Sequence, residues 1–254
     1  MRRYIPLMLG LLSFIIIISV WELLVRAGFL NPFFTSRPTA IADALKQQAI
    51  SGELLRNVSV SLVEFVAGFT LAVIVGVFLG VLIGWYKIVD YALDPFIWFL
   101  YSAPLVAFYP IFVIILGLGK PTVIAITFLM CVIVILINSA AGIRNVDPLL
   151  IQVAQSFGAR RYELFFKIAL PASIPMVIAG LRLGVGRALL AVVVAEMFGA
   201  TDGLGASISY YGGTLKTTNM LASLIVITGL GVVLTQGLTL VEGYFDSWRT
   251  GPGT

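Results

Sequence analysis

Residues 58–85 read VSVSLVEFVAGFTLAVIVGVFLGVLIGW, and Glu64 is the one charged side chain in this run. An α-helix needs about 20 mostly apolar residues to cross the hydrocarbon core of a bilayer, so the run is long enough to span a membrane. Its apolar residues are continuous and do not alternate with polar ones, which favours a helix over the strand of a membrane barrel. The stretch therefore predicts a transmembrane helix.

Small residues recur along the same run at intervals of four, at Gly68, Ala72, Gly76, Gly80 and Gly84. Residues spaced by four lie on one face of a helix, and small side chains there let a neighbouring backbone approach closely. The run near residues 172–198 carries a similar row, at Gly180, Gly184 and Ala188. The two rows predict that these two helices pack against each other.

The rest of the chain is similarly apolar. Of its 254 residues, 60% are hydrophobic and 11% are charged, whereas about a quarter are charged in a soluble domain, so a soluble globular fold is excluded. Six runs are long enough to be spans, near Ile5–Val25, Val58–Trp85, Phe96–Leu118, Thr122–Ala140, Ala172–Phe198 and Leu221–Tyr244. We predict an all-α polytopic membrane protein with six transmembrane helices in a single domain over residues 1–254.

Local signals refine this division. The first run starts like a signal peptide, but it is long and no small-residue cleavage site follows closely, so we expect it to be retained. Pro38 can begin a short amphipathic helix that Ser51 and Gly52 end, and we expect this helix to lie along the membrane surface. Residues 1–56 would then be a first span and a surface helix, and residues 57–245 a core bundle. In the third run, Pro104 and Pro110 each remove a backbone donor and predict a disturbed helix.

Charge and cysteine content limit the possible functions. The formal net charge is +4, but no basic run exceeds two residues, so no nucleic-acid partner is expected. The chain has no histidine and one cysteine, Cys131, which we expect to be buried. Metal sites with His or Cys ligands, Cys–His catalytic pairs and internal disulfides are excluded, so we predict no catalytic residue and no metal ligand. Basic residues concentrate between the fourth and fifth runs, at Arg144, Arg160, Arg161 and Lys167, which indicates that this connection and both termini are cytoplasmic.

That connection, residues 145–171, reads NVDPLLIQVAQSFGARRYELFFKIALP. Asp147 before Pro148 is a strong helix start, and Gly158 permits a sharp turn before a second short helix over Arg160–Leu170 that ends near Pro171. The first helix is expected to carry an apolar face, formed by Leu149, Leu150, Val153, Ala154 and Phe157. From the residues alone, this face fits a helix resting on lipid headgroups as well as one docking on a protein.

The segment resembles the cytoplasmic loop of binding-protein-dependent ABC importer permeases, in which Glu-Ala-Ala is followed by three residues, Gly, nine residues, Ile, one residue and Leu-Pro. The matching residues are Ala154, Gly158, Ile168, Leu170 and Pro171, whereas Gln152 and Val153 replace the Glu and the first Ala. In that family the loop is the coupling helix that fits a cleft on the ATPase. The resemblance implies a docking role for Asp147, Leu149, Leu150, Gln152, Val153, Ala154, Phe157, Gly158, Ala159, Arg160, Ile168, Leu170 and Pro171. The neutral Gln152 implies docking that depends less on charge.

The resemblance covers about residues 57–213, through the strings SLVEFVAGF, DPFIWFLYSAP, GIRNVDP, GLRLGVGRALLAVVVAEM and GATDGLG. This set is similar to the branch of type I importer permeases that handles nitrate, sulfonates, taurine and bicarbonate. It implies a multi-pass subunit of a prokaryotic inner membrane, paired with itself or a related permease. Separate ABC ATPase subunits and an extracytoplasmic solute-binding protein would be its partners, and ATP and magnesium would bind the ATPase. The string GLGKPT around Lys120 lacks the spacing of a phosphate-binding loop, so no cofactor is expected on this chain.

Charged residues inside spans are costly and are usually paired or functional, which singles out Glu64, Arg182, Arg187 and Glu196. One hypothesis is that Glu64 forms an ion pair with Arg182 or Arg187, and the other is that these groups line the path of an anionic solute. Three further candidates for the pathway are Pro104, Tyr109 and Asn138.

Two other classes of membrane protein explain less of the sequence. A secondary transporter or channel explains the spans but gives no reason for the Gly, Ile and Leu-Pro spacing. An intramembrane enzyme is disfavoured because the sequence has no His or Cys pair and its membrane carboxylates are not visibly clustered. The resemblance therefore implies a non-enzymatic permease subunit for a small solute such as a sulfonate, a nitrate-like anion or a small heterocycle.

Overall fold

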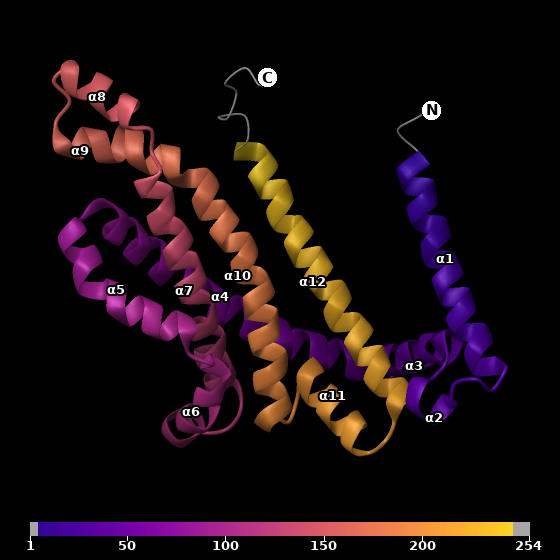
Figure 1. The fold of residues 1–254 in the computed structure, drawn as a ribbon. Coiled ribbons are helices and arrows are strands. Elements are labelled where there is room, and N and C mark those ends of the chain that lie inside the picture. Colours follow the sequence, from indigo (N-terminus) through magenta and orange to yellow (C-terminus); the bar gives the residue numbers. More distant parts are fainter. Residues whose placement is uncertain (1–4, 246–254) are drawn as a thin grey trace.

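The computed structural model describes residues 5–245, with side chains over residues 8–240, and all regular structure in this part is helical (Figure 1). The longer helices are α1 (Ile5–Arg26), α3 (Pro38–Ile50), α4 (Glu53–Trp85), α5 (Lys87–Ser102), α7 (Lys120–Arg144), α10 (Leu170–Gly199) and α12 (Thr217–Phe245). The shorter ones are α2 (Pro32–Thr35), η1 (Leu105–Phe108), α6 (Tyr109–Leu116), α8 (Pro148–Ser156), α9 (Arg161–Glu163), η2 (Leu164–Ala169) and α11 (Leu204–Gly213). Five helices are long and apolar enough to cross a membrane, or up to six if a bent pair counts as one span.

The two ends of the bundle carry different elements. Figure 1 shows the start of α1, the end of α12 and the α8–α9 segment at one end, and α2, α3, α6 and α11 toward the other. The short helix predicted to begin at Pro38 is present as α3, and it is followed by Gly52 in a left-handed conformation (φ +77°). Ile41 and Ala44 of α3 pack against Ala222 of α12, so the N-terminal elements are attached to the bundle.

Helix α7 lies between α4 and α10. A Cβ atom added at Gly68 would lie 2.7 Å from Thr127 of α7, and one at Gly80 would lie 2.5 Å from the carbonyl oxygen of Leu136. From the other side, a Cβ at Gly180 of α10 would lie 2.6 Å from the Cβ of Asn138. The predicted contact between the two helices is present, since a Cβ at Gly184 of α10 would lie 3.2 Å from Phe69 of α4, but both small-residue rows mainly receive the side chains of α7.

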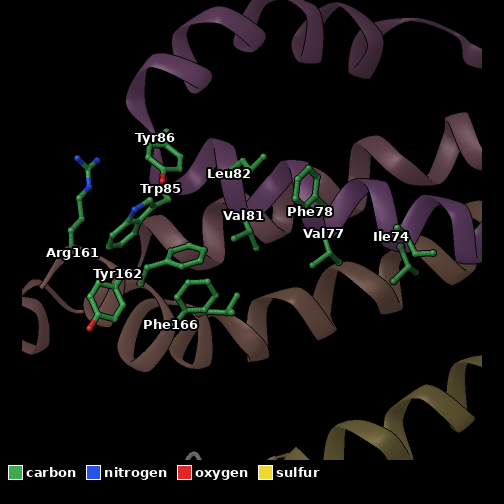
Figure 2. A pocket seen from close by; sticks show the side chains of 13 residues that line it. Ile74, Val77, Phe78, Val81, Leu82, Trp85, Tyr86, Arg161, Tyr162 and Phe166 are labelled. Atoms are coloured by element: carbon green, nitrogen blue, oxygen red, sulfur yellow. The ribbon is translucent and has the colours of Figure 1, made fainter.

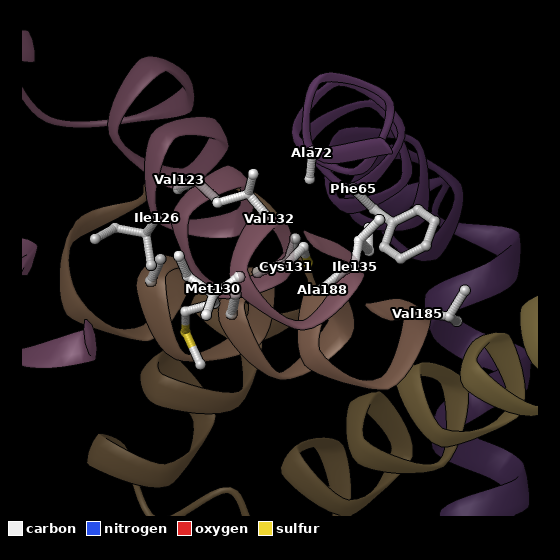
Figure 3. Packing of buried hydrophobic residues seen from close by; sticks show 14 of the residues in the cluster. Phe65, Ala72, Val123, Ile126, Met130, Cys131, Val132, Ile135, Val185 and Ala188 are labelled. Atoms are coloured by element: carbon white, nitrogen blue, oxygen red, sulfur yellow. The ribbon is translucent and has the colours of Figure 1, made fainter. Parts of the chain in front are cut away.

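The core of the bundle is centred on α7 (Figure 3). Val123, Ile126 and Ile135 of this helix are at most 1% exposed, as are Ala72 of α4 and Ala188 of α10. Cys131 is buried among them, as expected, and its thiol donates to the carbonyl oxygen of Gly184 at 3.4 Å. Apolar side chains gain little from leaving lipid, so close van der Waals packing of this kind is what holds membrane helices together.

The third predicted span is broken. Helix α5 ends at Ser102, and the following pair η1–α6 runs at 91° to it. Ala103 is extended (φ −72°, ψ 141°), which is the conformation that Pro104 imposes on the preceding residue. Pro110 lies in the first turn of α6, where its missing N–H costs no hydrogen bond. The expected disturbance is confirmed, but the helical segment starts earlier than the predicted run Phe96–Leu118, since α5 begins at Lys87, and it forms a span only if the bent pair is counted as one.

The packing of α4 on α7 is testable at Gly80. We expect Gly80→Ala to lower the unfolding temperature of the detergent-purified protein, because overpacking a tight contact typically costs about 1–3 kcal/mol. Gly229→Ala in α12 is the matched control, since an added Cβ there meets nothing within 4 Å. Equal unfolding temperatures for the two variants would contradict the α4–α7 contact.

Candidate functional site

The connection between α7 and α10 folds into a helical hairpin. The Asp147 carboxylate accepts a hydrogen bond from the Leu149 N–H at 2.8 Å and caps α8, as the sequence predicted. Gly158 then adopts a left-handed conformation (φ +80°) that reverses the chain. The backbone N–H of Arg160 donates to the Glu163 carboxylate at 2.9 Å, which closes the start of α9. The turn therefore depends on the glycine and is fixed by caps on both sides.

The apolar face of α8 points away from the bundle. Leu149, Leu150 and Val153 are 62%, 51% and 47% exposed, and Phe157 is 88% exposed. Gln152 is also exposed. Exposed apolar residues gathered at one place on a protein commonly mark an interaction surface. The structure thus leaves Leu149, Leu150, Val153 and Phe157 of the predicted docking residues uncovered within this chain.

The second half of the hairpin departs from the prediction. A helix ending near Pro171 was expected, but α9, η2 and α10 continue into one another from Arg161 to Gly199. The six residues of η2 form a π-helical turn, and the Leu170 N–H donates to the Phe165 carbonyl. Pro171 then lies in the first turn of α10. A π turn changes the hydrogen-bond register, which lets the helix pass a residue that has no N–H to donate.

A hollow of about 490 Å³ lies between the two arms of the hairpin. Its walls include Leu150, Val153 and Phe157 from the α8 arm, and Ile168 from η2. Lys167 and Glu163 form an ion pair of 2.9 Å at its rim. Ile168 and Leu170 are half-buried, so these two motif residues support the hairpin while the α8 face is presented outward.

A larger apolar groove, of about 1020 Å³, lies between α4 and the α9–η2 arm of the hairpin (Figure 2). Trp85 packs against Phe165 with ring centroids 5.1 Å apart, and the Arg161 guanidinium lies 5.5 Å from the Tyr86 ring centroid. The sequence analysis did not predict this groove, because its walls come from segments about 80 residues apart in the sequence. The periodic pattern of one segment indicates its own helix but not which distant segment lies beside it.

Glu64 and Glu196, both 1% exposed, lie together rather than beside an arginine. Their carboxyl groups are in hydrogen-bonding contact. Glu196 also accepts from the Ser61 hydroxyl and from the Gly205 N–H, each at 2.6 Å. The expected ion pair of Glu64 with an arginine is not among those formed within residues 8–240. The statement that the membrane carboxylates are not clustered is also wrong for this pair, because helices distant in sequence bring them together.

This carboxyl pair anchors the N-terminus of α11 on α4. The Leu204 N–H donates to Ser61 at 2.9 Å, and the Gly203 N–H donates to Asn57 at 3.2 Å. Gly203 has φ +116°, and a Cβ there would collide with the Glu196 carboxyl group. Gly203 and Gly205 of the GATDGLG string are thus required by a close backbone approach to Glu196.

A direct test is to remove the Glu196 carboxyl group. Glu196→Ala leaves the Ser61 hydroxyl and the Gly205 N–H without their acceptor, and unsatisfied buried groups cost about 1–3 kcal/mol each. We expect a clear drop in unfolding temperature for this variant. Asp202→Ala is the control in the same segment, because Asp202 makes an exposed ion pair with Arg56 and accepts an exposed hydrogen bond from Thr201. A Glu196→Ala protein as stable as Asp202→Ala would show that the network is not structural.

The remaining pathway candidates are not gathered in one place. Pro104 and Arg187 line a common cleft of about 330 Å³ beside the break between α5 and η1. Tyr109 instead packs on Phe198 near the end of α10, with ring centroids 5.5 Å apart. Asn138 lies in the seam between α7 and α10, and its amide donates to the Val134 carbonyl at 2.8 Å. Arg182 lies half-buried on α10.

Known proteins resemble this chain over most of its length. Residues 72–250 match the model of a family described as "binding-protein-dependent transport system inner membrane component". A protein of Methanocaldococcus jannaschii named as an ABC transporter permease is 34% identical over 91% of this chain and 88% of its own. The Bacillus subtilis protein SsuC, named for aliphatic sulfonates transport, is 30% identical over 95% of this chain and 88% of its own length. The taurine transport permease TauC of Escherichia coli is 28% identical over 98% of this chain and 92% of its own length.

Permeases named for bicarbonate and for nitrate, both from Synechocystis, match at 27% and 30% identity. They cover 93% and 84% of this chain, and 87% and 74% of their own lengths. Among solved structures, a chain of the methionine ABC transporter MetNI in an inward-facing conformation superposes with a TM-score of 0.65. At 18% identity, over 76% of this chain and 95% of that chain, this likeness shows the fold.

Proposed function

We propose that this chain, which belongs to the family of binding-protein-dependent transport system inner membrane components, forms the pathway for a small anion and docks its ATPase through residues 147–171. As a member, it is a multi-pass, non-catalytic permease subunit of an ABC importer. The family matches give no support to the alternative of a secondary transporter or channel.

The observation that carries the docking proposal is the uncovered apolar face of α8. A helix resting on lipid would keep Phe157 at the membrane surface, but α8 stands beyond the end of α7 at the tip of a hairpin (Figure 1). Its five apolar residues and the adjoining hollow fit a protein surface with complementary shape. We assign this end of the bundle, with the start of α1 and the end of α12, to the cytoplasm. The basic residues of the hairpin agree with that side.

The proposed solute class rests on the relatives. Their names give aliphatic sulfonates, taurine, bicarbonate and nitrate as cargo, and most of these are small anions. We therefore propose a sulfonate or a nitrate-like anion as cargo of this chain, with a small heterocycle as the alternative. A separate solute-binding protein would deliver it, and two permease subunits, identical or related, would enclose the path.

The proposed mechanism needs no chemistry from this chain. ATP and magnesium would bind between the partner ATPases and draw them together. Because the hairpin is continuous with both α7 and α10, a movement of α8 would tilt these two helices and the α4 helix packed on them. Residues 145–171 are the proposed coupling loop, residues 57–245 the moving core and residues 1–56 a peripheral first span with its surface helix.

Docking can be tested by placing a charge on the α8 face. We expect Leu149→Asp or Phe157→Asp to reduce co-purification of the ATPase at least about tenfold, because a charge on an apolar contact must be desolvated without a partner. Membrane insertion should be unchanged, since both side chains are exposed in the free chain. The control is Ile50→Asp, which alters a 77% exposed apolar residue at the end of α3. Wild-type amounts of ATPase with both α8 variants would overturn the docking proposal.

A further inference from the structure

We infer that the cleft beside Pro104 is an anion-binding subsite of the pathway, with the Arg187 guanidinium group as the counter-charge for a sulfonate or similar oxyanion. This inference rests on the proposed function, because it names the place where the proposed solute class is recognised within the membrane. The residue on which it depends is Arg187 of α10.

Arg187 is exposed at membrane depth. It lies twelve residues before the end of α10 at Gly199, which is about 18 Å along the helix at 1.5 Å per residue. An arginine facing lipid near the bilayer centre costs about 2.5–3.5 kcal/mol on insertion scales, so such residues usually face protein or a water-filled cavity. The side of α10 that carries Arg187 is therefore unsuited to lipid contact and suited to the pathway.

This chain supplies no counter-charge to that arginine in the part described. Within residues 8–240, Arg187 takes part in no ion pair or side-chain hydrogen bond. The carboxyl groups of Glu64 and Glu196 contact each other and the start of α11, so neither is directed to this cleft. A guanidinium group left in this way has its donors available for an added anion.

The cleft is formed where the helix breaks. The extended backbone at Ala103 and Pro104 separates α5 from η1 and leaves a cleft of about 330 Å³ against α7 and α10. Tyr101 stands on one wall, and Ile133 and Val134 of α7 form another. This volume is at the small end of the range for ligand sites and suits a small solute. Broken helices in membranes survive where they line a cavity, and they often carry the substrate sites of transporters.

The chemistry of the cleft selects an anion with several oxygens. A guanidinium group presents parallel N–H donors that match two oxygens of one oxyanion. Apolar walls lower the local dielectric and strengthen this attraction, and the positive charge of Arg187 repels a cation in the same place. The other occupant that would satisfy Arg187 is a carboxylate from a second permease subunit, and the experiment below separates the two.

The test uses thiol reagents of opposite charge on the assembled complex in membrane vesicles. Cys131 is the one cysteine of the chain, so Cys131→Ala gives a thiol-free background in which Ala103→Cys places a thiol on the cleft wall. The probes are sulfonatoethyl methanethiosulfonate, an anion, and trimethylammonioethyl methanethiosulfonate, a cation. The rate at which each reagent modifies the protein thiol is divided by the rate at which the same reagent modifies free cysteine. Val134→Cys repeats the measurement from the α7 wall if Ala103→Cys does not assemble.

We expect the anionic reagent to be favoured about tenfold or more, because a cleft lined by one sign of charge raises the local concentration of counter-ions by 10–10³. Arg187→Gln should bring the ratio of the anionic rate to the cationic rate close to one. Methanesulfonate should slow the modification of the thiol only where Arg187 is present. Arg37→Gln removes the same charge from an exposed residue outside the cleft and should leave the ratio unchanged.

Equal ratios with and without Arg187 would overturn the subsite. So would a thiol that reacts with neither charged reagent in vesicles, which would mean that lipid or the second subunit seals the cleft. A carboxylate from a second subunit would neutralise Arg187 and abolish the preference in the unmodified complex, which also overturns the proposal. ATPase docking is tested separately by Leu149→Asp and Phe157→Asp, so failure of the subsite with intact docking leaves the proposed function standing.

Discussion

The close approach of α4 and α10 to α7 is the constraint on which the rest of this structure depends. Neither small-residue row leaves room for a side chain, so α7 is held from both sides along most of its length. This packing brings Glu64 of α4 beside Glu196 of α10 and so provides the dock for α11. It also sets α7 against the broken α5–η1 segment, where the cleft with Arg187 forms. At its other end, α7 leads directly into the hairpin.

The hairpin and the cleft are thereby joined through two helices. Both α7 and α10 contribute to the cleft, and both are covalently continuous with the hairpin arms. A displacement of α8 by the ATPase would be transmitted to α7 and α10 through the short connections at residues 145–147 and 157–160. The π turn in η2 is a further irregular step toward α10, and π turns are frequent at functional sites in helices. The network around Glu196 fixes α11 at the opposite end of the same core.

The sequence predicted most of the helices, the Asp147 cap and the Gly158 turn, because long apolar runs, caps and glycine turns are local properties. The partner of each helix was not predictable, since a row of glycines marks a face but does not say which helix meets it. For the same reason Glu64 was paired with an arginine, and its contact with Glu196 became visible only in three dimensions. Pro104 indicated a break but not its 91° angle. The passage of α10 through Pro171 depends on a π turn that has no sequence signature in this chain.

The central claim is that the α8 face docks on the ATPase, and photo-cross-linking from position 157 tests it most directly. Phe157 is 88% exposed, so the larger aromatic cross-linker benzoylphenylalanine can replace it without a clash inside the chain. In membranes that contain the assembled transporter, we predict a cross-link between this chain and the ATPase subunit. The same replacement at Phe29, which follows the far end of α1 and is 79% exposed, should give none. Cross-links from position 157 to lipid alone, with the ATPase present, would contradict the account.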